Sequence, residues 1–261
     1  MGRGGGIVNL AAPARSGVLE TDETWEGDVR VEGDVVVPEG RRLVLAPGCR
    51  LTFARPPRWA CAVFRSAREG YPIEASQREL CDIVVLGRLE ALGTPERPVA
   101  LGADGAPWGG VLCLRSGRAD LASASLSAGG DAALQTFDDA RASLRDCSLC
   151  GTEIAVRALG RSLVEAAGGT IRAGRCAIQA GEGARVRLDG VELVDAPEGC
   201  SVWDGATLDA TFCRFVRARE RGVSVRDVAW ARLRGCEWRE TPVPGERRHP
   251  ARLDIRPEPG R

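Results

Sequence analysis

Hydrophobic residues recur at a regular interval through the second half of the chain. Further apolar or small residues lie at fixed places after each anchor of this repeat. The anchors are Leu121, Leu144, Ala166, Leu188, Ala210 and Leu233. A repeat of about 22 residues with strand-like alternation is typical of a solenoid, in which each unit forms one coil and packs on its neighbours.

Charged residues at the predicted outward positions alternate in sign from one unit to the next. In a parallel stack, equivalent residues lie directly above one another, so each row becomes a ladder of opposite charges. A wrong alignment would not produce two such rows, and the alternation therefore supports the predicted register. The two rows are Glu165, Arg187, Asp209 and Arg232, and Glu192, Arg214 and Glu237.

The alternating pattern defines the predicted organisation of the chain. It begins near Trp25 and predicts a parallel β-helix over 23–240, with about nine coils of about 22 residues each. Residues 55–80 break the rhythm and are expected to form a loop or short helix extruded from one coil. Residues 1–22 are expected to be a flexible leader, and the Pro- and Arg-rich segment 241–261 a disordered tail or a strap over the last coil.

Composition narrows the partners and the compartment. The 261 residues carry a formal net charge of zero, which favours neither nucleic acid nor a membrane surface as a partner. No run of 18 apolar residues predicts a membrane span. The first residues lack the apolar stretch of about 7–15 residues found in signal peptides, so we expect a cytoplasmic protein.

The ten cysteines are expected to be reduced core residues. Cys147, Cys213 and Cys236 fall in one predicted apolar row, and Cys176 and Cys200 in another. Small buried thiols suit a narrow coil interior, and a reducing cytosol keeps them free. Disulfides between stacked neighbours and a metal site are the alternatives.

The early coils contain a series of short Gly, Pro and β-branched motifs. These are Gly27-Asp28-Val29, Gly33-Asp34-Val35, Pro38-Glu39-Gly40, Gly87-Arg88-Leu89, Pro98-Val99 and Trp108-Gly109-Gly110-Val111. With them the chain resembles bacterial right-handed parallel β-helix repeat proteins of the pectin lyase-like superfamily. The resemblance implies a single-stranded, right-handed parallel β-helix. It implies no single activity, because this fold carries lyases, hydrolases, epimerases, adhesins and scaffolds.

No catalytic set is expected. A polygalacturonase-like site needs carboxylates beside a histidine, and the one histidine, His249, lies in the predicted tail. Asp146 and Asp189 are two coils apart, roughly 10 Å, which is too far to share one Ca²⁺. Asp138-Asp139 is expected to form a turn, with a metal site as the alternative. The sequence therefore favours a protein that is not an enzyme and that has no metal and no cofactor.

Two groups of residues are candidates for binding. The first lies in the 55–80 insertion, where Arg and aromatic residues could anchor a protein interface or pin the loop to its own rod. The second is a predicted outward stripe beside Trp230 that could hold a glycan or form an ordinary solvated face. The insertion residues are Arg55, Arg58, Trp59, Phe64, Arg65 and Tyr71, and the stripe residues are Gln135, Arg157, Gln179, Trp203 and Arg226.

Three functions are compatible with these features. The first is a non-catalytic scaffold or interaction module that presents a rigid surface to a protein partner. The second is a polysaccharide-binding protein, or a degenerate polysaccharide lyase or hydrolase. The third is a bactofilin-like cytoskeletal protein that self-associates through its coil ends, which the insertion at 55–80 makes less favourable.

Overall fold

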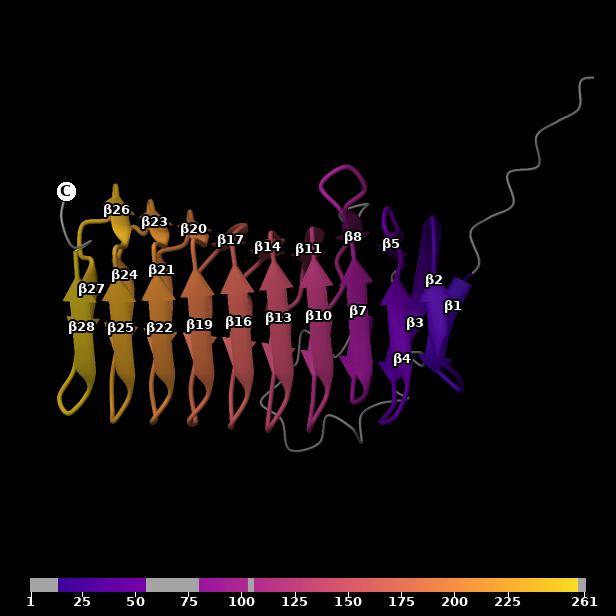
Figure 1. Ribbon diagram of the computed structural model, residues 1–261, viewed down its shortest axis with the longest axis horizontal. Helices are drawn as coiled ribbons and strands as arrows, with labels where there is room; N and C mark the ends of the chain where they lie inside the picture. The colour runs from indigo at the N-terminus through magenta and orange to yellow at the C-terminus, as the bar shows by residue number, and fades with distance from the viewer. Residues whose placement is uncertain (1–13, 55–79, 103–105, 258–261) are drawn as a thin grey trace, which may run out of the picture.

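The computed structural model describes residues 14–54, 80–102 and 106–257. All 28 regular elements in these ranges are β-strands, stacked side by side along the long axis of the molecule (Figure 1). Each strand pairs in parallel with its equivalent in the next coil, as Glu165 does with Arg187 and Arg187 with Asp209. The predicted parallel β-helix is therefore confirmed, while its right-handedness stays a prediction.

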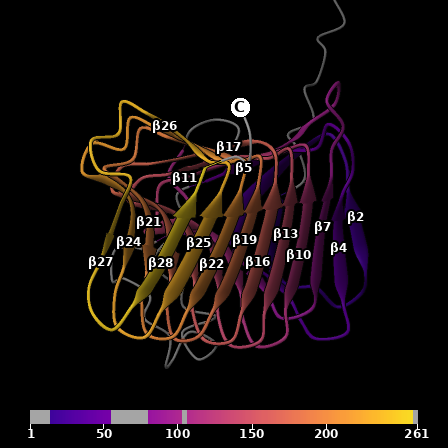
Figure 2. The same cartoon turned by 60° about the vertical axis from the view of Figure 1, so that its left-hand side comes forward.

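The strands form two sheets that enclose the core (Figure 2). The smaller sheet contains ten strands: β2 (Glu23–Trp25), β4 (Arg42–Leu45), β7 (Arg88–Leu92), β10 (Arg118–Ala122), β13 (Arg141–Arg145), β16 (Leu163–Ala167), β19 (Arg185–Asp189), β22 (Thr207–Thr211), β25 (Trp230–Arg234) and β28 (Arg252–Arg256).

The larger sheet contains 18 strands, because most coils contribute two. They are β1 (Ala14–Val18), β3 (Asp28–Val37), β5 (Arg50–Phe53), β6 (Asp82–Val85), β8 (Val99–Leu101), β9 (Gly110–Cys113), β11 (Ala124–Ala128), β12 (Ala132–Thr136), β14 (Ser148–Gly151), β15 (Ile154–Ala158), β17 (Thr170–Ala173), β18 (Cys176–Ala180), β20 (Glu192–Val194), β21 (Glu198–Val202), β23 (Arg214–Val216), β24 (Arg221–Val225), β26 (Glu237–Arg239) and β27 (Gly245–Arg247).

The solenoid is longer than the sequence pattern predicts. Strand β1 lies inside the segment expected to be a flexible leader, and β27 and β28 lie inside the expected tail. The smaller sheet accordingly has ten stacked strands rather than about nine. The sequence analysis missed β1 and β27 because each contains at most one large apolar residue, and it missed β28 because the surrounding segment is rich in Pro and Arg.

The core is one continuous column of apolar side chains inside the coils. The anchor row runs through Leu144, Ala166, Leu188 and Ala210 in the observed register, and all four side chains are buried. Burial of each larger aliphatic side chain contributes about 1.5–3 kcal/mol. Aromatic rings also stack between coils, as the Phe215 and Trp238 ring centroids do at 4.4 Å.

The cysteine rows are confirmed in part. Cys147, Cys213 and Cys236 occupy one column. The hydrogen bonds between coils show this register, because the Thr170 amide donates to the Cys147 carbonyl and the Glu237 amide to the Cys213 carbonyl. Cys176 and Cys200 do not share a column, since Cys176 pairs with Glu198 and Cys200 with Ile178. The nine cysteines in the described part of the chain are all free thiols.

The charge ladders confirm the predicted register. Glu165, Arg187, Asp209 and Arg232 stand in one column of the smaller sheet. Arg187 bonds to Glu165 at 2.9 Å, and Arg232 lies 3.8 Å from Asp209. These pairs are solvent-exposed, and each contributes at most about 1 kcal/mol. They disfavour a shift between coils, because a shift would place like charges together.

Replacement of Arg187 by Glu tests this ladder. The substitution places three acids in one column and is expected to lower the free energy of unfolding by about 0.5–1 kcal/mol, as measured by urea denaturation. Arg185→Glu is the matched control, because Arg185 is an exposed residue of the same strand with no ion pair among the described residues. An equal loss in both variants would contradict the ladder.

Candidate interaction surface on the outer face of the larger sheet

A single outward column of side chains crosses the larger sheet. In β9, Val111 and Cys113 belong to the core, whereas Leu112 between them belongs to a separate cluster on the outer face. The same alternation places Val36 and Val84 outside the coil. Strand pairing continues this column as Val36, Val84, Leu112, Gln135, Arg157, Gln179, Ser201, Ser224 and Glu246.

The N-terminal half of this outer face is apolar and buried. The side chains of Val84 and Leu112 are fully buried although they point away from the core. A second outward column, formed by the first residue after the end of each strand, adds to the same cluster. The full cluster contains Val36, Val84, Leu112, Leu114, Phe137 and Leu159, with Leu86 and Trp203 packed against it. The outward-pointing residues thus change along the rod from apolar and buried to polar.

A buried ion pair lies where the apolar and polar halves meet. The Arg157 guanidinium donates a short hydrogen bond to the Asp131 carboxylate, and only 10% and 6% of the two side chains are exposed. Arg157 also reaches the amide oxygens of Gln179 at 3.4 Å and Gln135 at 3.5 Å. Neighbouring coils are therefore held together here by polar contacts on the outside of the sheet.

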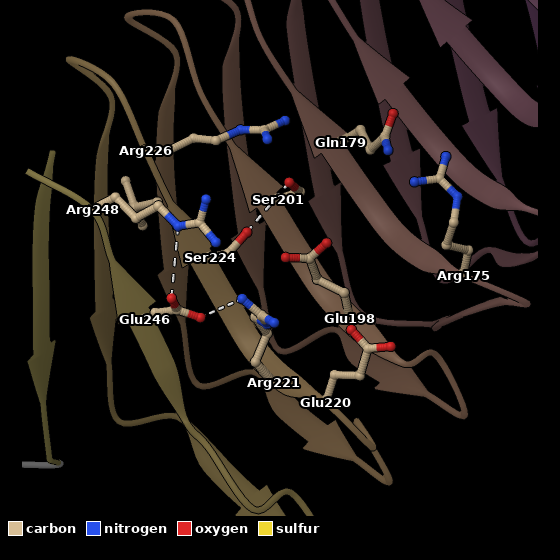
Figure 3. Close-up of a pocket in the computed structure, with 11 residues that line it drawn as sticks. Arg175, Gln179, Glu198, Ser201, Glu220, Arg221, Ser224, Arg226, Glu246 and Arg248 are labelled. Atoms are coloured by element: carbon tan, nitrogen blue, oxygen red, sulfur yellow. Dashed lines mark hydrogen bonds and ion pairs between the residues drawn. The ribbon is translucent and has the colours of Figure 1, made fainter.

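The C-terminal half of the face forms a polar groove of about 240 Å³ (Figure 3). Strands β18, β21, β24 and β27 supply most of its lining. Within it, Glu246 accepts a short hydrogen bond from Arg221 and lies 3.8 Å from Arg248. The hydroxyl of Ser224 donates to the hydroxyl of Ser201 at 3.3 Å. The groove therefore offers charges of both signs next to hydroxyl groups.

Three charged side chains that line the groove form no ion pair with any described residue. These are the carboxylates of Glu198 and Glu220 and the guanidinium of Arg226. Figure 3 shows both carboxylates beside Arg221, with Arg226 on another side of the groove. Because no described residue pairs with them, they are open to charged groups of a binding partner.

An aromatic platform lies at the edge of the groove. The Arg226 guanidinium stacks over the Trp203 ring, 5.2 Å from its centroid, in a cation–π contact. The ring also lies close to the backbone of Gly181, where an added Cβ would fall 2.5 Å from a ring carbon. Glycine at this position lets the indole lie close against the strand, so Trp203 is held between Gly181 and Arg226.

The stripe predicted from the sequence is two columns rather than one. Gln135, Arg157 and Gln179 share a column, but Trp203 and Arg226 lie two residues further on. The single stripe was wrong because Ile178 pairs with Cys200 and not with Val202. Side chains of a strand alternate between its two faces, so Cys200 and Val202 both point inwards and both fit the predicted apolar row.

Other predicted site residues fall elsewhere. Gln135 and Arg157 are buried rather than solvated. Trp230 belongs to β25 in the smaller sheet, with Arg232 located 4.2 Å from its ring. The insertion residues all lie outside the described part of the chain, namely Arg55, Arg58, Trp59, Phe64, Arg65 and Tyr71.

Several groove residues were missed by the sequence analysis. Glu198, Arg221 and Glu246 line the groove but were not singled out. Ser201 and Ser224 follow Gln179 in its own column, one and two coils later. Continuing the repeat from Gln179 coil by coil would have found both serines.

Burial and ion pairing shift the pKa of several titratable groups. Burial raises the pKa of the Cys49 thiol to about 11 and that of Cys113 to about 12, so both remain protonated and unreactive at neutral pH. Asp139 accepts two hydrogen bonds from Arg161, which lower the pKa of its carboxyl group. Within the described ranges, no three His, Cys, Asp or Glu residues gather as metal ligands.

Comparison of the chain with protein-family models, with curated proteins and with solved structures found no match. None of the described segments is a helix long and apolar enough to cross a bilayer. The geometry of the outer face therefore carries the functional argument.

The buried ion pair gives a test of this geometry. Asp131→Ala leaves Arg157 buried without its carboxylate and is expected to cost about 3–5 kcal/mol of unfolding free energy in urea denaturation. The double variant Asp131→Ala/Arg157→Leu should lose clearly less, because no buried charge remains. Asp139→Ala, which removes an exposed pair, is the control and should cost under about 1 kcal/mol. A double variant as unstable as Asp131→Ala would contradict the buried pair.

Proposed function

We propose that this protein is a non-catalytic, cytoplasmic β-solenoid interaction module that presents a rigid surface to a protein partner. The contact surface is the groove on the outer face of β18, β21, β24 and β27, together with Trp203. The observation that carries the proposal is the conjunction of an Arg-stacked tryptophan with three charged groups that have no ion-pair partner among the described residues.

The composition of this surface matches that of protein interfaces. Arginine and tryptophan are enriched among the residues that contribute most to binding free energy. Here Trp203 and Arg226 directly follow the paired strands β21 and β24 and stack on each other, which restrains both side chains, so less conformational entropy is lost when a partner binds. The mixed charges of Glu198, Glu220 and Arg226 favour a partner that carries both signs, and they set its orientation.

A cytoplasmic location is supported by the cysteines. All nine described cysteines are free, although Cys213 and Cys236 stand in one column of adjacent coils. Free thiols in such numbers suit a reducing compartment. The resemblance to bacterial β-helix proteins of the pectin lyase-like superfamily is compatible with this role, because that fold also serves as a scaffold.

Site-specific photo-crosslinking tests the protein-partner function. A photoreactive phenylalanine analogue replaces Glu220 in the groove, and in a control protein it replaces Arg185 on the smaller sheet. We expect a discrete adduct with one protein of the native cytosol from the Glu220 position only. Trp203→Ala/Arg226→Ala should lower the yield of this adduct at least about tenfold, the loss typical of a central interface residue. Equal adducts from both positions would contradict the proposal.

Glycan binding is the second candidate, favoured by the indole of Trp203 beside the hydroxyls of Ser201 and Ser224. Titration calorimetry with neutral and uronic acid oligosaccharides would show saturable heat that is lost in Trp203→Ala. Trp230→Ala is the matched control, because Trp230 also carries a stacked arginine but lies on the smaller sheet. Binding that survives Trp203→Ala, or no binding at all, would contradict this candidate. Release of unsaturated or hydrolysed products would indicate a retained lyase or hydrolase activity.

A further inference from the structure

The C-terminal end of the solenoid exposes an open strand edge. Strand β28 is the last of the ten-stranded sheet and pairs only with β25 among the described strands (Figure 1). Strands β26 and β27 are likewise paired on one side only, with β23 and β24. Unpaired backbone N–H and C=O groups along such an edge form a template for a further strand.

Core positions are also exposed at this end. The column that passes through Ala210 and Leu233 ends at Ile255, and the exposed fraction rises from 1% and 0% to 38%. Leu253 continues another interior column and is half-buried. Repeat proteins normally cover such an end with a polar cap, because each coil relies on its neighbours to bury its apolar side. Ile255 and Leu253 have no such cap among the described residues.

The N-terminal end presents a matching strand edge with the opposite charge. Strand β2 pairs only with β4 among the described strands. The exposed acids Asp22 and Glu26 flank it, and Asp22 accepts a hydrogen bond from the amide of Arg42 at 3.0 Å. At the other end, Arg252 and Arg256 occupy the first and last positions of β28 and are both exposed.

The register of the sheet brings these charges together when the stack is continued. Asp22 precedes β2 and stands opposite Arg42 of the next coil. The column that contains Arg42 continues through Arg88 and Arg118 to Arg252 at the far end. If β2 of a second copy follows β28 in the same register, its Asp22 lies next to Arg252. The same superposition places its Glu26 next to Arg256, which also pairs with Asp254 of its own strand at 3.0 Å, and it places the buried Trp25 in the column of Ile255.

We propose that the C-terminal coil binds the N-terminal coil of a second copy of this chain, so that β2 of one copy extends the sheet after β28 of the other. The alternative of two C-terminal ends facing each other brings Arg252 and Arg256 of both copies together and is disfavoured by repulsion. A contact between two different ends does not close on itself, and it therefore produces linear, open-ended assemblies.

Reciprocal charge reversal tests this contact. The variant Arg252→Glu/Arg256→Glu has two acidic ends, and Asp22→Arg/Glu26→Arg has two basic ends. We expect the unmodified protein to form linear oligomers that lengthen with concentration in sedimentation velocity and electron microscopy. Each variant alone should lose all oligomers and sediment as a monomer. An equimolar mixture should restore the assemblies, because each acidic end then meets a basic one.

The matched control is Arg141→Glu/Arg185→Glu, which changes the net charge equally at two exposed mid-rod positions of the Arg252 column. It should assemble like the unmodified protein. Far-ultraviolet circular dichroism and urea midpoints establish that every variant folds. The proposal is overturned if the unmodified protein stays monomeric at high concentration, or if the two folded variants fail to restore assembly when mixed.

Discussion

The in-register stacking of equivalent residues in successive coils is the constraint on which the rest of the structure depends. Parallel pairing between residues one repeat apart places each side chain above its counterpart, so every property of the molecule is organised in columns. Apolar columns form the core, and charged columns such as Glu165–Arg187 disfavour slippage. Because a strand repeats every two residues, a shift of one residue would turn each core side chain outwards.

The same stacking produces a column on the outer face whose residues change from apolar to polar along the rod. Val84 and Leu112 are buried at one end of a column that finishes with Ser224 and Glu246 at the other. The buried ion pair of Asp131 and Arg157 lies where the apolar and polar parts of the face meet. A groove built this way is rigid, since most of its side chains project from hydrogen-bonded strands. Rigidity of this kind would lower the entropic cost of binding in the interaction module that we propose.

Much of the fold could be predicted from the sequence, because the repeat fixes which residues are equivalent. The anchors from Leu144 to Leu233 and the charge ladders needed only the period and the alternation of strands. The groove was harder to predict, since Cys200 and Val202 both satisfy an inward position and single-sequence patterns cannot choose between them. Strand β1 was missed because Val18 is its one large apolar residue, and β28 was missed because it lies in a segment rich in Pro and Arg, although its apolar residues alternate as those of β19 do.

Distances between spin labels along one column would test this account most directly. Labels introduced as unnatural amino acids at Arg141 and Arg252 lie five coils apart in the observed register. At about 4.8 Å per coil, double electron–electron resonance should give a narrow distribution of label-to-label distances centred on about 24 Å. A broad distribution, or a distance that does not scale with the number of coils when one label is moved to Arg185, would contradict the stacked register on which the core, the groove and the proposed end contacts rest.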